Sequence, residues 1–162
     1  MAVTNQHENN GRNETRLERC DRNLAELLQE VRVVQTGVQV LFAFLLTVPF
    51  SAGFRTVTTF QTHVYFGTLL VTAAAAVLLI APTSWHRMLF RRGDKEHLVR
   101  IANLCALGGL TCVAVSIVGV VLLVSDVLFG SAVMVIAGSA AGSACALAWF
   151  VLPALRRRQI AR

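Results

Sequence analysis

The sequence predicts an all-α protein, a transmembrane four-helix bundle whose first helix extends into the cytoplasm. Of its 162 residues, 55% are hydrophobic and only 15% are charged, whereas about 25% of the residues in a soluble domain are charged. Crossing roughly 30 Å of hydrocarbon takes about 18 or more apolar residues. Four such runs cover residues 33–50, 60–81, 101–124 and 128–152, and none contains Asp, Glu, Lys or Arg.

The basic residues predict the orientation of this domain, which spans residues 33–155. Fourteen of the 15 Lys and Arg residues precede the first run, lie in the loop 82–100, or follow the fourth run. Only Arg55 lies elsewhere. By the positive-inside rule, both termini and the loop 82–100 are expected in the cytoplasm, and residues 156–162 form a basic cytoplasmic tail. The net charge of +6 then reflects topology and attraction to anionic lipid headgroups, not binding to nucleic acid.

The first run continues a helical pattern that begins well before it. Residues 1–14 are polar and without an apolar stripe, so we expect a disordered tail there. Thr15 and Glu18 have the spacing of a capping box, which predicts a cytoplasmic amphipathic helix over 15–32, continuous with the first span. Leu, Val and Cys occupy both apolar positions of a heptad repeat through residues 17–48. This seam would pack either on helices of the same chain or on a second copy, as a homo-oligomer.

Proline, aromatic, basic and small residues predict helix ends, membrane anchors and helix contacts. Pro49 and Pro82 are expected to end the first and second helices. The loop 82–100 should anchor at the membrane surface, because it combines an aromatic residue with basic neighbours. The expected anchors are Trp85, Arg87, Arg91 and Arg92. In the fourth run, Gly138 and Gly142 form a G-x-x-x-G pair that indicates a close helix contact, within or between chains.

A row of polar residues on the first helix enters the membrane and forms a candidate site. Steps of three and four residues place them on one face, and a buried amide in hydrocarbon needs hydrogen-bond partners. They would serve either as hydrogen bonds between helices or as a wet notch open to the cytoplasm. The candidate polar notch consists of Glu30, Arg32, Gln35, Thr36, Gln39 and Asn103, the last on the third run.

Titratable residues at the opposite membrane face form a second candidate site. Arg55, His63 and Asp126 are expected at the outer ends of the helices. Asp126 would either join the other two as an outer polar cluster or cap the fourth helix and face water.

The sequence contains no signature of an enzyme, a cofactor site or a metal site, and its four histidines are scattered. We therefore expect a non-enzymatic helix-packing or assembly module. The alternative is a small monovalent cation/proton antiporter or a transporter component. Such carriers normally keep an ionisable residue within the membrane, and no run has a carboxylate in its middle.

Most of the chain resembles a family of small bacterial four-span membrane proteins of unknown function. The resemblance covers roughly residues 17–158 and is carried by NLAELLQEVRVVQTGVQVLFAFLLTVPF, FQTHVYFGTLL, LLIAP and HRMLFRRGDKEHLVRIAN. Its most specific part is ELLQE-x-R-V-x-QTG-x-Q. Members are sometimes labelled sodium:proton antiporters automatically. The resemblance implies four helices in a bacterial cytoplasmic membrane and no assigned activity.

Overall fold

The computed structural model describes residues 16–89 and 95–160, and within them it leaves aside the side chains of 16, 17, 20, 21, 24, 55, 86–89, 95–98, 157 and 160. Long helices dominate the described chain, as the sequence predicted. Four helical stretches are long and apolar enough to cross a membrane: Ala25–Phe50, Thr59–Trp85, Val99–Phe129 and Ser131–Arg156. The all-helical fold and the number of apolar helices are thus confirmed.

Helix α1 (Arg16–Thr47) is one continuous rod of 32 residues with no break at Gly37. Pro49 lies in the 3-10 turn η1 (Val48–Phe50) that follows it. A second 3-10 turn, η2 (Ala52–Thr56), leads to α2. The heptad seam faces the inside of the chain, because Val31, Val38 and Leu45 are buried. This part of the seam is therefore covered by helices of the same molecule.

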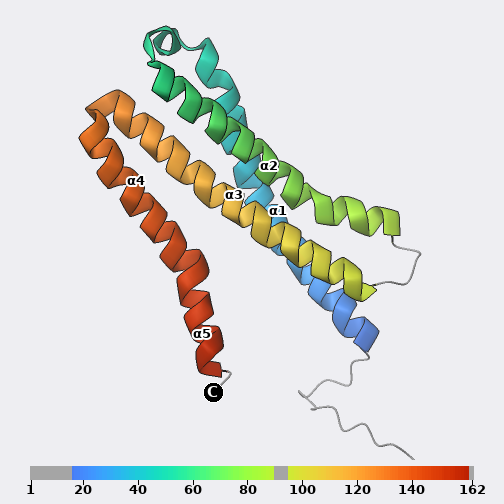
Figure 1. Cartoon of the computed structure of the whole chain (residues 1–162). Coiled ribbons are helices and arrows are strands. Elements are labelled where there is room, and N and C mark those ends of the chain that lie inside the picture. Colours follow the sequence, from blue (N-terminus) through green and yellow to red (C-terminus); the bar gives the residue numbers. More distant parts are fainter. Residues whose placement is uncertain (1–15, 90–94, 161–162) are drawn as a thin grey trace, which may run out of the picture.

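Helix α2 (Thr59–Leu89) does not end at Pro82, which corrects the sequence prediction. Pro82 is buried inside the helix. Proline within a membrane helix is tolerated where neighbouring structure compensates for the missing hydrogen bond, and it commonly kinks the helix. In Figure 1 the last turns of α2 run in a different direction from its first turns.

Helix α3 (Lys95–Phe129) and helix α4 (Ser131–Ala146) form a hairpin joined by the single residue Gly130. Gly130 has φ of 85°, a left-handed conformation that favours glycine. After α4, the chain passes through a π-helical turn, η3 (Leu147–Val151), into α5 (Leu152–Ile160). The fourth helix therefore continues past residue 152 without leaving the helical path.

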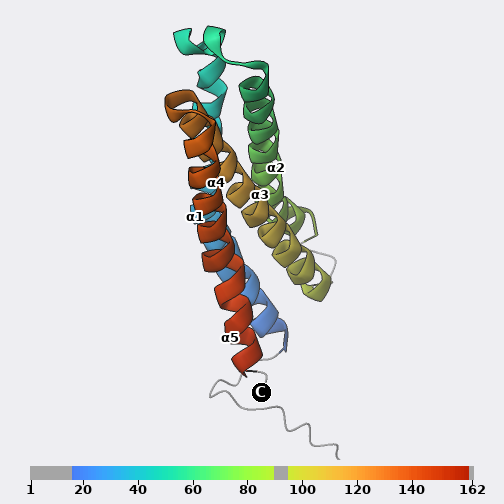
Figure 2. The same cartoon turned by 60° about the vertical axis from the view of Figure 1, so that its left-hand side comes forward.

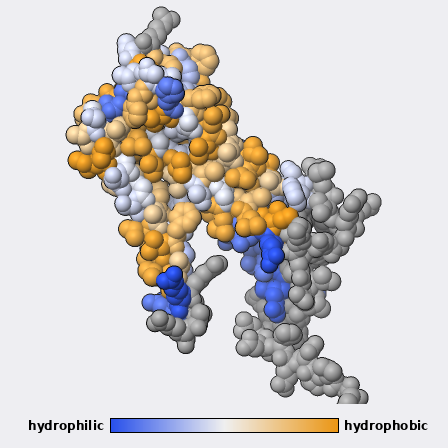
Figure 3. Space-filling model, in the orientation of Figure 1, coloured by the Kyte–Doolittle hydropathy of each residue, from blue (hydrophilic) through white to orange (hydrophobic). Residues whose placement is uncertain are grey.

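Three helices share the core, and the fourth stands to one side. Helices α1, α2 and α3 pack on one another in every pairing, whereas α4 packs on α3 alone among them. In both views α3 lies between α2 and α4 (Figure 1, Figure 2). The α4–α5 leg diverges from α1 and α3 toward its far end, which Figure 3 shows as a separate projection. Described residues of α5 pack only on the neighbouring turn η3.

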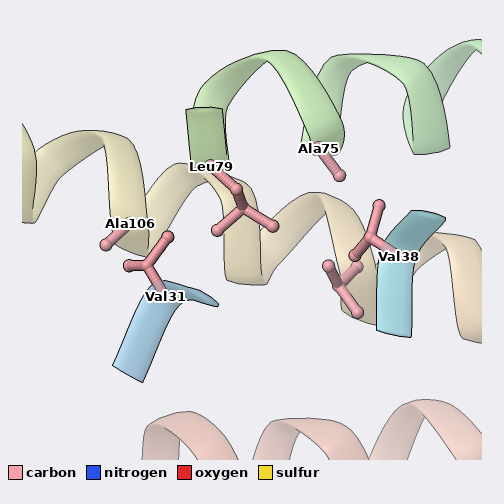
Figure 4. Packing of buried hydrophobic residues seen from close by; sticks show 6 residues of the cluster. Val31, Val38, Ala75, Leu79 and Ala106 are labelled. Atoms are coloured by element: carbon pink, nitrogen blue, oxygen red, sulfur yellow. The ribbon is translucent and has the colours of Figure 1, made fainter. Parts of the chain in front are cut away.

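Small and branched side chains fill the centre of the three-helix unit (Figure 4). The buried cluster draws two residues from each helix, and no charged side chain belongs to it. Its members are Val31 and Val38 of α1, Ala75 and Leu79 of α2, and Ala106 and Val113 of α3. Near the start of α3, Ala102 is buried against Leu27 and Leu28.

Glycines let neighbouring helices approach α3 closely on two sides. A Cβ at Gly109 would overlap Leu79 of α2, and one at Gly119 would overlap Thr68 of the same helix. On the other side, a Cβ at Gly138 would overlap Leu122. In lipid, where apolar solvent gives helices little reason to associate, such close backbone approach is the main source of packing energy.

Large apolar side chains cover the outside of the helices. Phe44, Val77, Leu104 and Ile136 are all exposed, and hydrophobic residues dominate the visible surface in Figure 3. Described hydrophilic residues gather mainly at the ends of the molecule in that view. A hydrocarbon solvent suits this distribution, since exposed apolar area costs nothing there.

Candidate functional site

The polar notch residues on α1 do not converge on one point. Gln35 is half-buried because it lies between Val31 and Val38 on the packed face, whereas Gln39 and Arg32 are exposed on the adjoining flank. Glu30, Thr36 and Asn103 are exposed as well. The Thr36 hydroxyl donates to its own helix, to the Arg32 carbonyl, at 3.1 Å.

The structure records no hydrogen bond between two described members of the notch, Gln39 on α1 and Asn103 on α3. The row on α1 therefore forms a polar flank beside the core. Both roles that the sequence suggested for this row, hydrogen bonding between helices and a wet notch open to the cytoplasm, stay predictions.

At the opposite end of the bundle, a hydrogen bond joins α2 to α3. The Gln61 amide nitrogen donates to Asp126 Oδ2 at 2.9 Å, and Gln61 Oε1 accepts from the Thr58 backbone N–H at 2.9 Å. The nitrogen and the oxygen of the amide are thus each held by a partner, Asp126 and Thr58 respectively. The sequence patterns did not single out Gln61 as a site residue, although it lies only two positions before the candidate residue His63.

Asp126 does not cap the fourth helix, which corrects one of the two sequence readings. Helix α3 continues past it to Phe129, and the N-cap of α4 is Gly130, which has no side chain to cap with. Asp126 is half-buried beside Gln61, while His63 is exposed. The side chain of Arg55 lies outside the described residues.

Tyr65 supplies a hydrogen bond that Pro49 cannot. In a helix, the carbonyl of residue 45 would accept from the N–H of residue 49, and proline has none. The buried Tyr65 hydroxyl donates to the Leu45 carbonyl at 2.8 Å. The same ring meets Phe54 edge to face, with centroids 5.1 Å apart. Tyr65 therefore fixes both the end of α1 and the turn that follows.

A second buried polar contact ties α2 to α3 near the middle of the bundle. Thr72 Oγ1 and Ser116 Oγ lie 2.9 Å apart and are both buried. Each hydroxyl also reaches a carbonyl of its own helix, Thr72 that of Thr68 and Ser116 that of Cys112. Interhelical hydrogen bonds of this kind contribute about 0.6 to 2 kcal/mol each in a membrane.

The remaining candidates are the glycine pair of the fourth helix and the expected anchors at the membrane surface. Gly138 and Gly142 both face α3, at Leu122 and Val118 respectively. Trp85 is 42% exposed near the end of α2, as a surface anchor requires. The side chains of Arg87, Arg91 and Arg92 lie outside the described residues.

Metal chemistry gains no support from the described side chains. Within residues 16–89 and 95–160, no three His, Cys, Asp or Glu side chains come together in a group that could hold a metal ion. The side-chain polar groups that meet between helices of the described chain are one amide, one carboxylate and three hydroxyls. These groups can bind by hydrogen bonds or by charge.

Four apolar helices of spanning length define, by composition, the class of multi-pass membrane proteins. The chain belongs to the family of unknown function DUF6328, whose model matches residues 13–153. No curated protein and no solved structure is detectably similar to it.

Proposed function

We propose that the protein is a non-enzymatic helix-packing module of the bacterial cytoplasmic membrane, with both termini in the cytoplasm, and that it pairs with a second copy through α4. The supporting observation is the position of α4, which packs on α3 alone and leaves its other faces outside the three-helix unit. Of the four apolar stretches, the one containing α4 is the least buried, at 6%, against 28% for that of α2.

The face of α4 that points away from α3 has the composition of a helix contact. Ala140 and Ala144 are exposed there, four residues apart. Exposed Ile136 and Leu147 lie on the same side, one turn before and after them. Small residues at this spacing let two membrane helices approach closely, while larger neighbours pack around the crossing. Because Gly138 and Gly142 already serve the contact with α3, this second small pair remains for a partner.

The heptad seam of α1 contributes less to this proposal than the sequence suggested. Val31, Val38 and Leu45 are buried within the chain, so a second copy cannot reach them. The seam residues Leu17, Cys20 and Leu24 have side chains outside the described set. Crosslinking of Cys20 between chains in intact membranes would show that this part of the seam also joins two copies.

Cysteine crosslinking tests the α4 contact. In a variant with the native cysteines replaced by alanine, Ala144→Cys should give a crosslinked dimer in native membranes on oxidation. Ala74→Cys is the matched control, because Ala74 is also an exposed alanine, on α2. Equal crosslinking at both positions, or none at Ala144→Cys, would contradict the proposal.

The antiporter alternative makes a different prediction in purified vesicles. A carrier would produce a change of internal pH when a sodium gradient is applied, and Asp126→Asn or Gln39→Leu would abolish that change. We expect no such flux. A sodium-driven pH change that depends on either residue would establish the carrier and overturn the packing module.

A further inference from the structure

An apolar cavity of ≈ 290 Å³ lies where the Gly130 hairpin end of α3 meets the start of α2 and the 3-10 turns. Its walls come from Val48 and Phe54 on the turns, Gln61 on α2, and Leu123 and Val127 on α3. Nearly all of the lining is hydrocarbon. Its volume falls near the lower end of those that hold small ligands, and such sites typically combine apolar walls with one or two oriented polar groups.

The amide of Gln61 is a polar part of the cavity wall, and two hydrogen bonds fix its orientation. The amide is held by Thr58 on one side and by Asp126 Oδ2 on the other. Asp126 precedes the lining residue Val127. Asp126 itself does not line the cavity, but its Oδ2 lies 2.9 Å from the amide nitrogen of Gln61, which does, so the carboxylate stands one hydrogen bond behind the wall.

The charge of Asp126 indicates what the cavity would accept. Asp126 is half-buried, and a carboxylate that is partly removed from water attracts a cation more strongly than one in bulk water does. Among the described side chains, the hydrogen-bond partner of Asp126 is Gln61, a neutral amide that leaves the negative charge in place; the side chain of Arg55 lies outside that set. Asp126 is also the only acidic residue within 31–93 and 97–162, so no second carboxylate in these segments competes for a cation.

We propose that this cavity binds an amphiphilic ammonium cation, with its alkyl chain against Val48, Phe54 and Leu123 and its charged group at the Asp126 carboxylate. The alkyl chain leaves water for an apolar wall, and the ion pair forms in a medium of low dielectric, where it is strong. The site is independent of the α4 surface, because Ile136, Ala140 and Ala144 take no part in it.

Binding can be measured on the full chain in nanodiscs of zwitterionic phosphatidylcholine by calorimetric titration with octyltrimethylammonium, with empty nanodiscs as the blank. Asp126→Asn keeps the size of the side chain and removes its charge, so we expect the affinity to fall tenfold or more. Octanol has the same chain without the charge, and its affinity should not change in this variant.

A second pair of variants tests the cavity itself. A Cβ at Gly53, which lines the cavity, would meet no atom within 4 Å, and the same holds for Gly67 on the exposed side of α2. Gly53→Leu should fill the space and weaken both ligands tenfold or more, whereas Gly67→Leu should weaken neither.

Three results would overturn the proposal. Wild-type protein could bind the ammonium no better than empty nanodiscs do, Asp126→Asn could bind it as tightly as wild type, or the two leucine variants could behave alike. Circular dichroism and a monodisperse elution profile show which variants are folded. Because charge and cavity are altered at separate positions, loss of one variant to misfolding still leaves the other to decide.

Discussion

Pro49, Pro82 and Pro153 each deprive one helical carbonyl of its N–H donor, and the chain accommodates each differently. After α1 the Tyr65 hydroxyl takes the place of the missing donor. Within α2, Pro82 is buried and the helix continues. Before Pro153 the helix widens into a π turn, with the Leu152 N–H bonded to the Leu147 carbonyl. Single residues thus decide where these rods end, bend or widen.

Tyr65→Phe tests the first of these arrangements. The substitution removes the donor to Leu45 and leaves a buried carbonyl unpaired, so we expect the free energy of unfolding to fall by about 1–2 kcal/mol. Reversible unfolding in mixed micelles measures it. Thr111→Val is the control, because Thr111 is exposed and its hydroxyl only reaches the carbonyl of Leu107 on the same helix. An equal, small loss of unfolding free energy in both variants would contradict the idea that the Tyr65 hydroxyl replaces the N–H donor that Pro49 lacks.

At the scale of elements, α3 is the helix on which the others assemble. It packs on α1, α2 and α4, and its own small residues, Gly109 and Gly119, admit α2 at close range. Across the other interface the small residue belongs to α4, where Gly138 meets Leu122. The interfaces of α3 with α2 and with α4 therefore both include positions where an added methyl group would overlap a neighbouring side chain.

Gly138→Ala should destabilise the protein by about 1–3 kcal/mol, because the new methyl group would overlap the Leu122 side chain, which would have to leave its position or push the two helices apart. Gly37→Ala, in α1, should do the opposite. Its Cβ meets no atom within 4 Å, and alanine favours a helix over glycine by up to about 1 kcal/mol. Thermal unfolding of both variants in detergent measures the difference. A stabilising Gly138→Ala would mean that α4 does not approach α3 as described.

The elements follow from the sequence more fully than their contacts do. Uninterrupted apolar runs have one stable outcome in lipid, a spanning helix, and the seam of α1 indicated its buried face correctly. Pro82 misled the prediction because burial against neighbouring helices overrides its tendency to end a helix. Asp126 misled it because the turn is one residue long. Thr72, Ser116 and Gln61 act across helices, and their pairing depends on a register that local patterns do not encode.

At the scale of the whole molecule, the chain divides into a three-helix unit with a shared core and a fourth helix attached along one side. The three-helix unit buries Val38, Ala75 and Leu79 at its centre, while the turn from Leu147 to Val151 has no buried residue. Among the long helices α4 packs on α3 alone, and that division is the observation on which the proposed function rests.

Dipolar spectroscopy on a single spin label at Leu147, with the native cysteines replaced, tests the central claim of that proposal, pairing through α4, most directly. Because each molecule carries one label, any defined distance must arise between two copies. In lipid nanodiscs or vesicles we predict such a distance, and we predict that its signal falls as labelled protein is diluted with unlabelled protein. A signal with no dipolar coupling at any protein-to-lipid ratio would contradict pairing through α4.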